Sequence, residues 1–524
     1  MQRREFIKWM GVLGGGAYLT RLGGLASPDV YAAAAETYEK IVESDNVLVL
    51  INLSGGNDGL NTVIPLDQYD NLAAARPSIV IPKNRVLALN TKTGLHPSLV
   101  NFKSLYDESK LTIVQSVGYE TPNMSHFRSS DVIWTGGNYD DFLSTGWQGR
   151  YLDKNFLGFP SGYPSAENPD PIMLTMTSGA ATIGQGAGGS FSVVSTNPSS
   201  KVTFEDNLYS GYSLSGDGRY ENELEFVRSS QGQTKSYTQA VYDTYQKGPE
   251  ITTISVDAGN LEKDLLAITT LLGGGIKTKV FLLQLGGFDT HGGQVTEGDS
   301  TQGKHADLLS ELDTAVGSFM ASLSDNGLDD RVTGLVFSEF GRRIISNESY
   351  GSDHGHAAPW FLFGNKVSGT ILGESPVIPN PATKQDNVPF QFDFKNVYKG
   401  IFEDWFGLDE STSESLFDFT PAKVSLFKEP YVTPINAAML SASVGMAYPN
   451  PVYTQTSIPI ELSANSRVAL QLVSSKGEVL QSHQYTLGVS DTVLNLERQG
   501  EASGKYYLRV SVNGEVETQT LEFR

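Results

Sequence analysis

Four continuous apolar runs constrain the fold of this chain more than any other feature of its sequence. They occupy residues 47–53 (VLVLINL), 111–117, 279–285 and 332–337. An apolar side chain at nearly every position of a strand means that both faces of the strand are buried, as in a parallel sheet covered by helices on both sides.

Helical patterns lie between these runs. Residues 261–272 and 308–323 each place a stripe of apolar side chains on one helical face. The alternation of strands and helices predicts an α/β domain over residues 45–430, with a mostly parallel sheet flanked by helices. Residues 178–248, rich in Gly, Ser, Thr and Tyr, are interpreted as an insertion.

The composition excludes several classes of protein. The chain of 524 residues contains no cysteine, which excludes zinc fingers, disulfide scaffolds, iron–sulfur sites and cysteine nucleophiles. Any metal site is therefore limited to His and carboxylate ligands. With 59 acidic against 38 basic side chains, the formal net charge is −21. Because affinity for nucleic acid comes largely from Lys and Arg, we expect no nucleic-acid partner.

The N-terminus has the features of an export signal. Arg3-Arg4 is followed by a weakly apolar stretch and then by small residues at 32–35. This order is typical of a twin-arginine signal peptide, here residues 1–35, and implies the twin-arginine translocase as a partner. A membrane anchor is the alternative, but the stretch is broken by glycines and is shorter than the roughly 20 residues of a span. We expect no transmembrane segment in the mature chain.

The C-terminal residues 446–524 have a different pattern. Short runs of alternating apolar and polar side chains are separated by turn residues, and Asn513-Gly514 is a hairpin signal. The pattern predicts a small all-β sandwich. An accessory immunoglobulin-like module that binds carbohydrate or spaces domains is one interpretation of such a sandwich.

A resemblance favours another interpretation of these residues. Tyr448-Pro449-Asn450-Pro451, residues 476–479 and residues 504–510 resemble three separated blocks of the C-terminal sorting domain of type IX secretion substrates. The resemblance implies the type IX secretion machinery as a partner. It also implies an exported protein, secreted or attached to the outer-membrane surface of a Bacteroidetes-type bacterium.

Side chains that can bind a metal ion follow the apolar runs of the central domain. Three of the seven histidines, His291, His354 and His356, lie in Gly-rich segments of this kind, beside Asp289 and Asp353. Ligands gather at the carboxyl ends of parallel strands, and imidazole with carboxylate suits a divalent cation such as zinc, manganese or calcium. The alternatives are an Asp289 that caps a helix and a polar surface loop at 353–356.

A further segment offers a nucleophile. Ser125 precedes His126 and Arg128 at the start of a helix-like run. Ser125 is either an ordinary N-cap or a nucleophile at a helix N-terminus, where backbone N–H groups favour an anionic ester oxygen. His126 and Arg128 are the catalytic candidates beside it. His96 and His305 are interpreted as structural histidines.

Several segments together resemble a known but uncharacterised family. They are residues 53–60 (LSGGNDGL), 124–128 (MSHFR), 286–293 (GGFDTHGG), 338–343 (SEFGRR) and 353–364 (DHGHAAPWFLFG). The family is domain of unknown function 1501, whose members typically begin with twin-arginine signals, and the resemblance spans about residues 45–430. That family is similar to a distant branch of the alkaline phosphatase and sulfatase superfamily, in which two metals and a Ser, Thr or modified nucleophile hydrolyse phosphate or sulfate esters.

The resemblance implies roles for individual residues. Asp58, which the sequence alone would place in a turn, would be a metal ligand, Ser125 would occupy the nucleophile region, and Asp289 with His291 would bind one metal. His354 would complete a metal site. Glu339 would replace a metal-binding Asp, whereas Phe340 cannot replace the His that usually follows it, which puts a second metal in doubt. Because the chain has no cysteine, a formylglycine sulfatase made from cysteine is excluded.

These inferences lead to one functional hypothesis and one alternative. The hypothesis is an exported, metal-dependent hydrolase of phosphate, sulfate or related esters on a small molecule or glycan. The metal would polarise the ester and activate Ser125 or a water molecule, and Arg342 or Arg128 would stabilise the developing charge. The alternative is a catalytically silent cell-surface binding protein that keeps the fold.

Overall fold

A computed structural model of the chain describes residues 45–156, 159–160, 163–165, 168–177, 182–202, 219–252, 254–255, 258–417, 421–428, 442–444, 447–462, 466–474, 479–487, 490–512 and 515–524. The predicted signal peptide at 1–35 and part of the predicted insertion at 178–248 lie outside the described residues. The chain divides into two compact units, Met1–Tyr431 and Val432–Arg524.

The first unit is built on a mixed sheet whose described strands number nine. In spatial order they are β11 (Ile371–Leu372), β5 (Leu111–Gly118), β10 (Ala358–Phe363), β9 (Val332–Phe337), β1 (Val47–Ser54), β8 (Val280–Gly286), β6 (Met173–Thr175) and β7 (Ser192–Val194), and β12 (Phe392–Asp393) pairs with β5. Among these strands only β10 runs against its neighbours, because its pairings with β5 and β9 are antiparallel and all the other pairings are parallel. The prediction of a mostly parallel sheet is confirmed.

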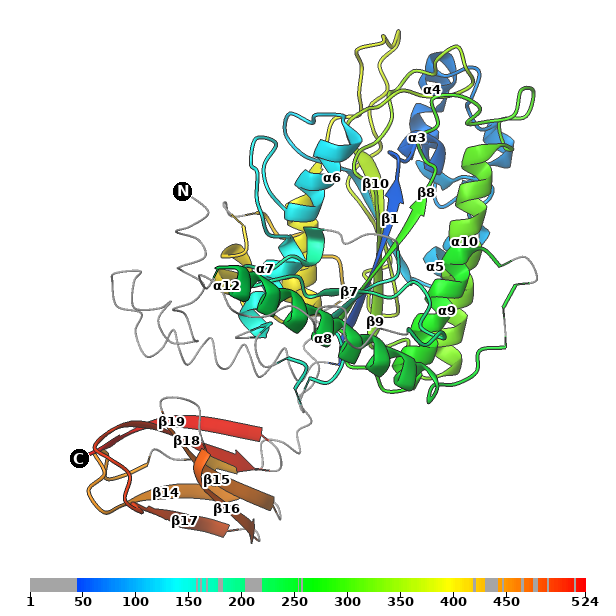
Figure 1. The fold of residues 1–524 in the computed structure, drawn as a ribbon. Coiled ribbons are helices and arrows are strands. Elements are labelled where there is room, and N and C mark those ends of the chain that lie inside the picture. Colours follow the sequence, from blue (N-terminus) through cyan, green and yellow to red (C-terminus); the bar gives the residue numbers. More distant parts are fainter. Residues whose placement is uncertain are drawn as a thin grey trace. The chain divides into compact units, whose positions relative to one another are not determined.

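Helices cover both faces of this sheet (Figure 1). On one face, Leu48 and Leu50 of β1 belong to a core that includes side chains of α6 (His126–Thr135), α7 (Trp147–Asn155) and α11 (Phe394–Gly400).

The opposite face of β1 has its own core. Val49 and Ile51 cluster there with side chains of α5 (Val100–Asp107), α9 (Asn260–Gly273) and α10 (Lys304–Asp325). The central strand therefore buries both of its faces, which explains why its sequence is continuously apolar.

Shorter elements complete the first unit. They are α3 (Gly59–Thr62), α4 (Tyr69–Ala75), α8 (Arg219–Tyr245), a π-helical turn (Ile401–Trp405), α12 (Glu410–Glu414), and a small antiparallel sheet of β2 (Val63–Pro65), β4 (Thr93–Leu95) and β3 (Leu87–Ala88). Within the predicted insertion, β7 pairs with β6 and so belongs to the main sheet.

The second unit consists of two antiparallel sheets. One contains β13 (Ala442–Val444), β14 (Gln455–Leu462) and β17 (Ser490–Glu497), and the other contains β16 (Val479–Leu487), β15 (Ser466–Ser474), β18 (Gly504–Val512) and β19 (Glu515–Phe523). Both sheets contribute side chains, such as Ile458 and Leu470, to a single core, as in a sandwich. The predicted turn at Asn513-Gly514 lies outside the described residues, but the strands on either side of it pair.

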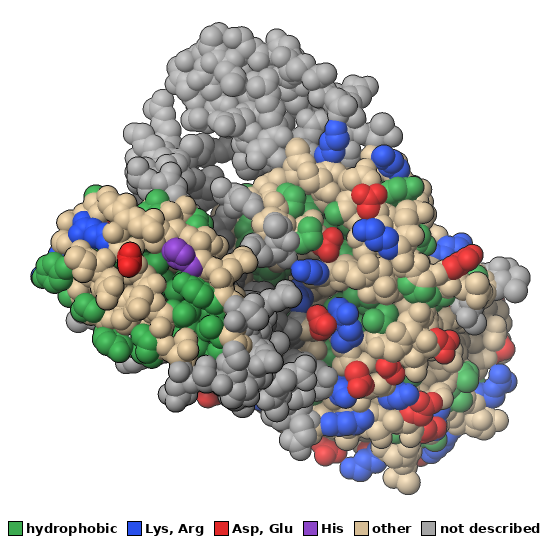
Figure 2. All heavy atoms as spheres, turned by 90° about the horizontal axis from the view of Figure 1, so that it is seen from below, with side chains coloured by type: hydrophobic (Ala, Val, Ile, Leu, Met, Phe, Trp, Pro, Cys, Tyr) green, Lys and Arg blue, Asp and Glu red, His purple; other side chains and the backbone are tan. Residues whose placement is uncertain are grey.

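Two expectations from the sequence concern membrane-spanning helices and the charge of the surface. No helix in the described part of the chain has the length and apolar character that crossing a bilayer requires. Acidic and basic side chains are interspersed on the face that Figure 2 shows.

Candidate metal centre

Five segments of the first unit meet at one edge of the main sheet. The strands β1, β5, β8 and β9 all end at this edge because they run in the same direction, and the antiparallel β10 begins there. The edge thus collects the residues that follow β1, β8 and β9, the start of α6 after β5, and the segment that precedes β10. These segments contain every residue that the sequence analysis proposed for the site.

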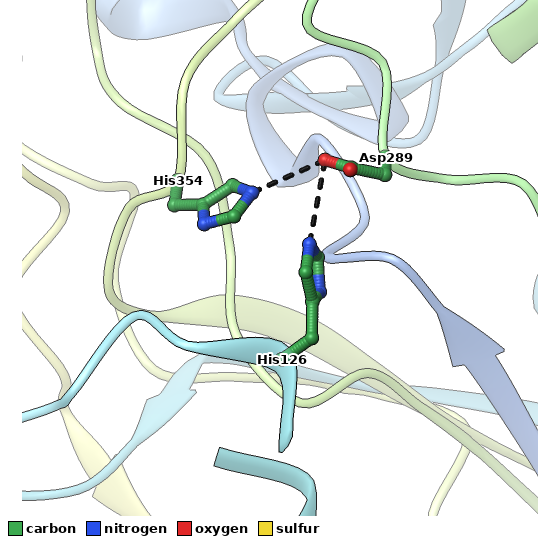
Figure 3. A group of neighbouring side chains, drawn as sticks. All are labelled: His126, Asp289 and His354. Atoms are coloured by element: carbon green, nitrogen blue, oxygen red, sulfur yellow. Dashed lines mark hydrogen bonds and ion pairs between the residues drawn. The ribbon is translucent and has the colours of Figure 1, made fainter. Parts of the chain in front are cut away.

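The carboxylate of Asp289 lies at the centre of this edge. Its Oδ1 atom is 3.1 Å from Nε2 of His354, 3.2 Å from Nε2 of His291 and 3.4 Å from Nε2 of His126. Figure 3 shows His126 and His354 pointing toward Asp289 from different segments. The ligand atoms of His126, Asp289 and His354 all lie within 4.8 Å of one another.

The charge on Asp289 is stabilised by its neighbours. Arg342 Nη2 donates a hydrogen bond to Oδ1 at 2.8 Å. Partial burial favours the neutral acid, but the hydrogen bond from Arg342 and its charge outweigh it and lower the pKa of Asp289 to about 2. The group is therefore an anion at any physiological pH.

The hydrogen bonds of His291 and His354 fix which ring nitrogen carries the proton. Nδ1 of His354 is 2.8 Å from the backbone oxygen of Met124, and Nδ1 of His291 is 3.0 Å from Oδ1 of Asp353. Both oxygens accept, so each Nδ1 carries a proton, and each ring presents a lone pair at Nε2 whenever it is neutral.

Three electron-rich atoms consequently converge on one small volume. The two Nε2 atoms of His291 and His354 are 2.9 Å apart, and both face Oδ1 of Asp289. When both rings are neutral, these atoms repel one another unless a proton or a metal cation lies among them. Ligand atoms that bind a divalent ion at about 2.0 to 2.2 Å are separated by about 3.0 to 3.5 Å, so the observed spacings suit a shared ion.

Glu339 lies behind this group. Its side chain is only 2% exposed, and Oε1 accepts hydrogen bonds from the backbone N–H of Gly55 and from His126 Nδ1, both at 2.8 Å. The second oxygen, Oε2, accepts a hydrogen bond from the Ser338 hydroxyl at 3.1 Å. Of these three partners, the ring of His126 connects Glu339 to Asp289.

Arg342 holds the segments together. Its guanidinium is buried and donates to the backbone oxygens of Gly56 at 2.7 Å, Ser352 at 2.8 Å and Phe288 at 3.0 Å, as well as to Gly55 and Asp289. These acceptors lie after β1, after β8 and before β10. Because its hydrogen bonds involve all three guanidinium nitrogens, Arg342 is suited to positioning Asp289 and the surrounding backbone.

Asp58 lies apart from the histidines. It is fully buried, and Arg76 donates to both of its oxygens, at 3.0 and 2.8 Å, while Gln294 donates to Oδ2 at 2.5 Å. Burial raises the pKa of Asp58, but the Arg76 charge more than compensates, and the net effect is a lowered pKa. The carboxylate is thus already neutralised by a guanidinium.

Arg128 and His356, which were also proposed for the site, lie outside the group around Asp289. Arg128 forms an ion pair with Asp131 and donates to the backbone oxygen of Tyr139 at 2.8 Å, which ties α6 to the loop that follows it. The ring of His356 makes no hydrogen bond to this group within the described residues, and burial lowers its pKa.

Ser125 is the N-cap of α6. Its backbone is extended, with φ −91° and ψ 128°, and its side chain makes no capping hydrogen bond. The hydroxyl is therefore not committed to the helix, and the next residue, His126, contacts Asp289. This position is compatible with either interpretation of Ser125.

Sequence reasoning missed two residues that shape the site. Asn347 donates to Oδ1 of Asp353 at 3.1 Å and to the backbone oxygen of His291 at 2.8 Å, so it holds both in place. Met124 has a positive φ of 60°, which is rare for a side chain of this kind, and its carbonyl accepts the proton of His354. Asn347 carries no sequence signal, whereas Met124 begins the segment 124–128 that resembles the family.

Two family models match the chain. Residues 224–398 match a family described as "Protein of unknown function (DUF1501)", and residues 446–522 match the "Secretion system C-terminal sorting domain". Both resemblances stated from the sequence are confirmed, the first over the matched stretch. The sorting domain makes this an exported protein that is secreted or held at the cell surface, as in Bacteroidetes. None of the curated proteins matches the chain.

Solved structures give distant similarities. The chain is similar to PsFucS1 sulfatase from Pseudoalteromonas sp., with 10% identity, a TM-score of 0.32 and coverage of 90% of this chain and 88% of that one. It is similar to phosphonate monoester hydrolase SpPMH from Silicibacter pomeroyi, with 12% identity, a TM-score of 0.31 and coverage of 92% and 89%. It spans only 9% of dimeric latent PorU from Porphyromonas gingivalis, with 17% identity, a TM-score of 0.14 and coverage of 16% of this chain. Scores this low carry no argument about activity, which depends on the geometry above.

Proposed function

We propose that this protein is an exported, metal-dependent hydrolase of phosphate, sulfate or related esters, with a divalent ion bound by Asp289, His291 and His354. The observation that carries the proposal is the convergence of two imidazole lone pairs and one carboxylate oxygen within 3.2 Å of one another. Residues 1–35 would direct export, residues 45–430 would form the catalytic domain, and residues 446–524 would direct secretion.

The ligand set limits the identity of the ion. Two neutral imidazoles and one carboxylate suit zinc, manganese or iron, whereas calcium prefers six to eight oxygen ligands. When bound, such an ion polarises an ester oxygen and stabilises negative charge that develops on it. Three protein ligands leave room for a substrate, and the side chains of Asp289 and His291 are each 47% exposed.

The other residues supply position and a nucleophile in this proposal. Arg342 holds Asp289 in place, and Asn347 and Asp353 hold His291. The hydroxyl of Ser125, at the N-terminus of α6, attacks the phosphorus or sulfur atom and loses its proton, the ester bond breaks, and the alcohol leaves with a proton. Water then cleaves the serine ester, which restores the hydroxyl and releases phosphate or sulfate.

A substrate panel tests the proposal. The full mature chain, loaded with zinc or manganese, is assayed on aryl phosphates, phosphodiesters, phosphonates and aryl sulfates beside Asp289→Asn. We expect at least one ester class to be hydrolysed, and we expect the variant to be about 100-fold slower or worse because the carboxylate ligand is lost. Equal rates for the two proteins would show that the site lies elsewhere, and no hydrolysis by metal-loaded wild type would favour the binding protein.

A further inference from the structure

His126 has a ring nitrogen that nothing in the described structure satisfies. Its Nδ1 is 2.8 Å from Glu339, whereas Nε2 is buried and has no hydrogen-bond partner. The same Nε2 lies 3.4 Å from Oδ1 of Asp289, and the rings of His126 and His354 are 4.4 Å apart at their centroids. A buried polar atom without a hydrogen-bond partner lowers the stability of the folded state, and in native structures such an atom often has a functional role.

The environment of Glu339 determines what this nitrogen presents. Oε1 of Glu339 accepts from the backbone N–H of Gly55, so it also accepts, and does not donate, in its contact with His126. The proton that this contact requires is on Nδ1, which leaves a lone pair on Nε2 in the neutral ring. A carboxylate behind a histidine, with the far nitrogen facing a cation, is a common arrangement around protein-bound metals.

We infer that His126 is a fourth ligand of the same divalent ion and that Glu339 is the residue that positions its ring. The inference rests on the proposed metal centre and changes two roles expected from the sequence: His126 was a catalytic candidate and Glu339 a ligand. Three of the four ligands would then be imidazoles, each with an acceptor behind it: Glu339 for His126, Asp353 for His291 and the Met124 carbonyl for His354.

The charges around the site favour one ion over two. The second buried carboxylate that the sequence offered, Asp58, already has the Arg76 guanidinium as its cation at 2.8 Å. The oxygens of Glu339 accept from Gly55, Ser338 and His126. With three imidazoles and one carboxylate, the site would select zinc, manganese or iron rather than calcium or magnesium, and the ester oxygen would take a fifth coordination position.

Metal titration of the full mature chain tests this inference without reference to activity. Wild type, His126→Ala, Glu339→Gln and Phe127→Ala are stripped with a chelator and titrated with Zn²⁺ in a calorimeter and with Co²⁺ in a spectrometer. Phe127 is the matched control, because it follows His126 in the same helix and its side chain is 91% exposed. Glu339→Gln keeps an acceptor for Gly55 and nearly the same shape, so it guards against a loss of fold in His126→Ala.

We expect wild-type affinity in Phe127→Ala, about 10- to 100-fold weaker binding in Glu339→Gln, and a comparable or larger loss in His126→Ala. The visible absorption of bound Co²⁺ should also change in His126→Ala, because a nitrogen ligand is lost. Wild-type affinity in both His126→Ala and Glu339→Gln would overturn the inference and leave the metal centre of Asp289, His291 and His354 intact. A wild-type protein that binds neither ion would overturn the metal centre itself.

Discussion

The Nε2 atoms of His291 and His354 lie 2.9 Å apart, and in the neutral rings both carry lone pairs because each Nδ1 donates to an oxygen acceptor. Two lone pairs in such proximity, both facing the Asp289 carboxylate, are favourable only around a positive charge. The loops that bring the two rings together are also held by Arg342 and Asn347. Residues outside the group thus help to keep these two nitrogens close to each other.

The role of Ser125 can be separated from that of the ligands. Ser125→Ala removes the proposed nucleophile and leaves the three imidazoles and Asp289 unchanged. We expect kcat to fall by about 1,000-fold or more and the affinity for Zn²⁺ to stay at the wild-type value. Steady-state kinetics on the best ester of the panel and a metal titration measure the two quantities. An unchanged kcat would mean that water, and not this serine, attacks the ester.

The loop that carries His291 packs directly against Gly351, where no side chain fits. A Cβ atom at Gly351 would lie 2.4 Å from the backbone oxygen of His291 and 2.5 Å from that of Thr290, too close for any real contact. We expect Gly351→Ala to lower the free energy of unfolding by about 1 to 3 kcal/mol and to weaken Zn²⁺ binding, because the loop must move.

Gly286 is the matched control for this substitution, since a Cβ there would meet open space. Gly286→Ala should change the free energy of unfolding by about 0.5 kcal/mol or less and leave Zn²⁺ binding unchanged. Chemical unfolding and metal titration distinguish the two variants. Equal behaviour of the two would refute the argument from close approach.

Two buried histidines make the first unit sensitive to acid. Burial lowers the pKa of His305 to about 4 and that of His96 to about 3. The ordinary pKa of a histidine in the unfolded chain is about 6.5. Between pH 6.5 and the lower pKa values of the folded protein, the unfolded state therefore binds protons that the folded state does not. Stability is therefore fully present above pH 6.5 and falls as the pH decreases, by up to about 1.4 kcal/mol per pH unit for each histidine.

Tryptophan fluorescence measures this effect in the full chain, because the last of the five tryptophans is Trp405 and all of them belong to the first unit. Urea unfolding at several values from pH 7 to pH 5 should show a shallower loss of stability in His305→Gln than in wild type. Gln keeps a donor for Asn57, which His305 Nε2 contacts at 3.0 Å. The same pH dependence in both proteins would contradict the assignment of His305 as a neutral buried ring.

The C-terminal unit is expected to be needed only for secretion. Deletion of residues 446–524 removes the sorting domain and leaves the α/β unit with its separate core. We expect the shortened protein to accumulate in the periplasm with its hydrolase activity and Zn²⁺ binding retained. Cell fractionation followed by an activity assay measures both. Unchanged secretion of the shortened protein would show that these residues do not direct secretion.

Much of the scaffold could be predicted because continuous apolar strands have a strong signal. The predicted run at 332–337 is strand β9 to the residue, and 111–117 differs from β5 by one residue. The direction of β10 had no such signal, since an apolar strand reads the same in either direction. Because β10 runs antiparallel to its neighbours, His354, which precedes β10, lies at the same edge of the sheet as Asp289.

The composition of the site was predicted better than the roles within it. Asp289 and His291 follow a predicted strand, which indicated the edge of the sheet at which they lie, whereas His354 precedes β10, a strand that the sequence analysis did not predict. The partner of Asp58 is Arg76, a contact within an irregular segment that no periodicity marks. Glu339 and His126 are 213 positions apart, and which nitrogen of the ring faces Glu339 depends on how both segments pack. Such details follow from tertiary contacts and leave no local pattern in the sequence.

The most direct measurement is the metal content of the full mature chain after reconstitution with zinc or manganese and removal of unbound ions, in wild type and in Asp289→Ala. Elemental analysis should find about one ion per chain in wild type and less than about a tenth of that in Asp289→Ala, since the variant lacks the carboxylate on which the imidazoles converge. A wild-type protein without bound ion, or a variant that retains the same amount, would contradict the account.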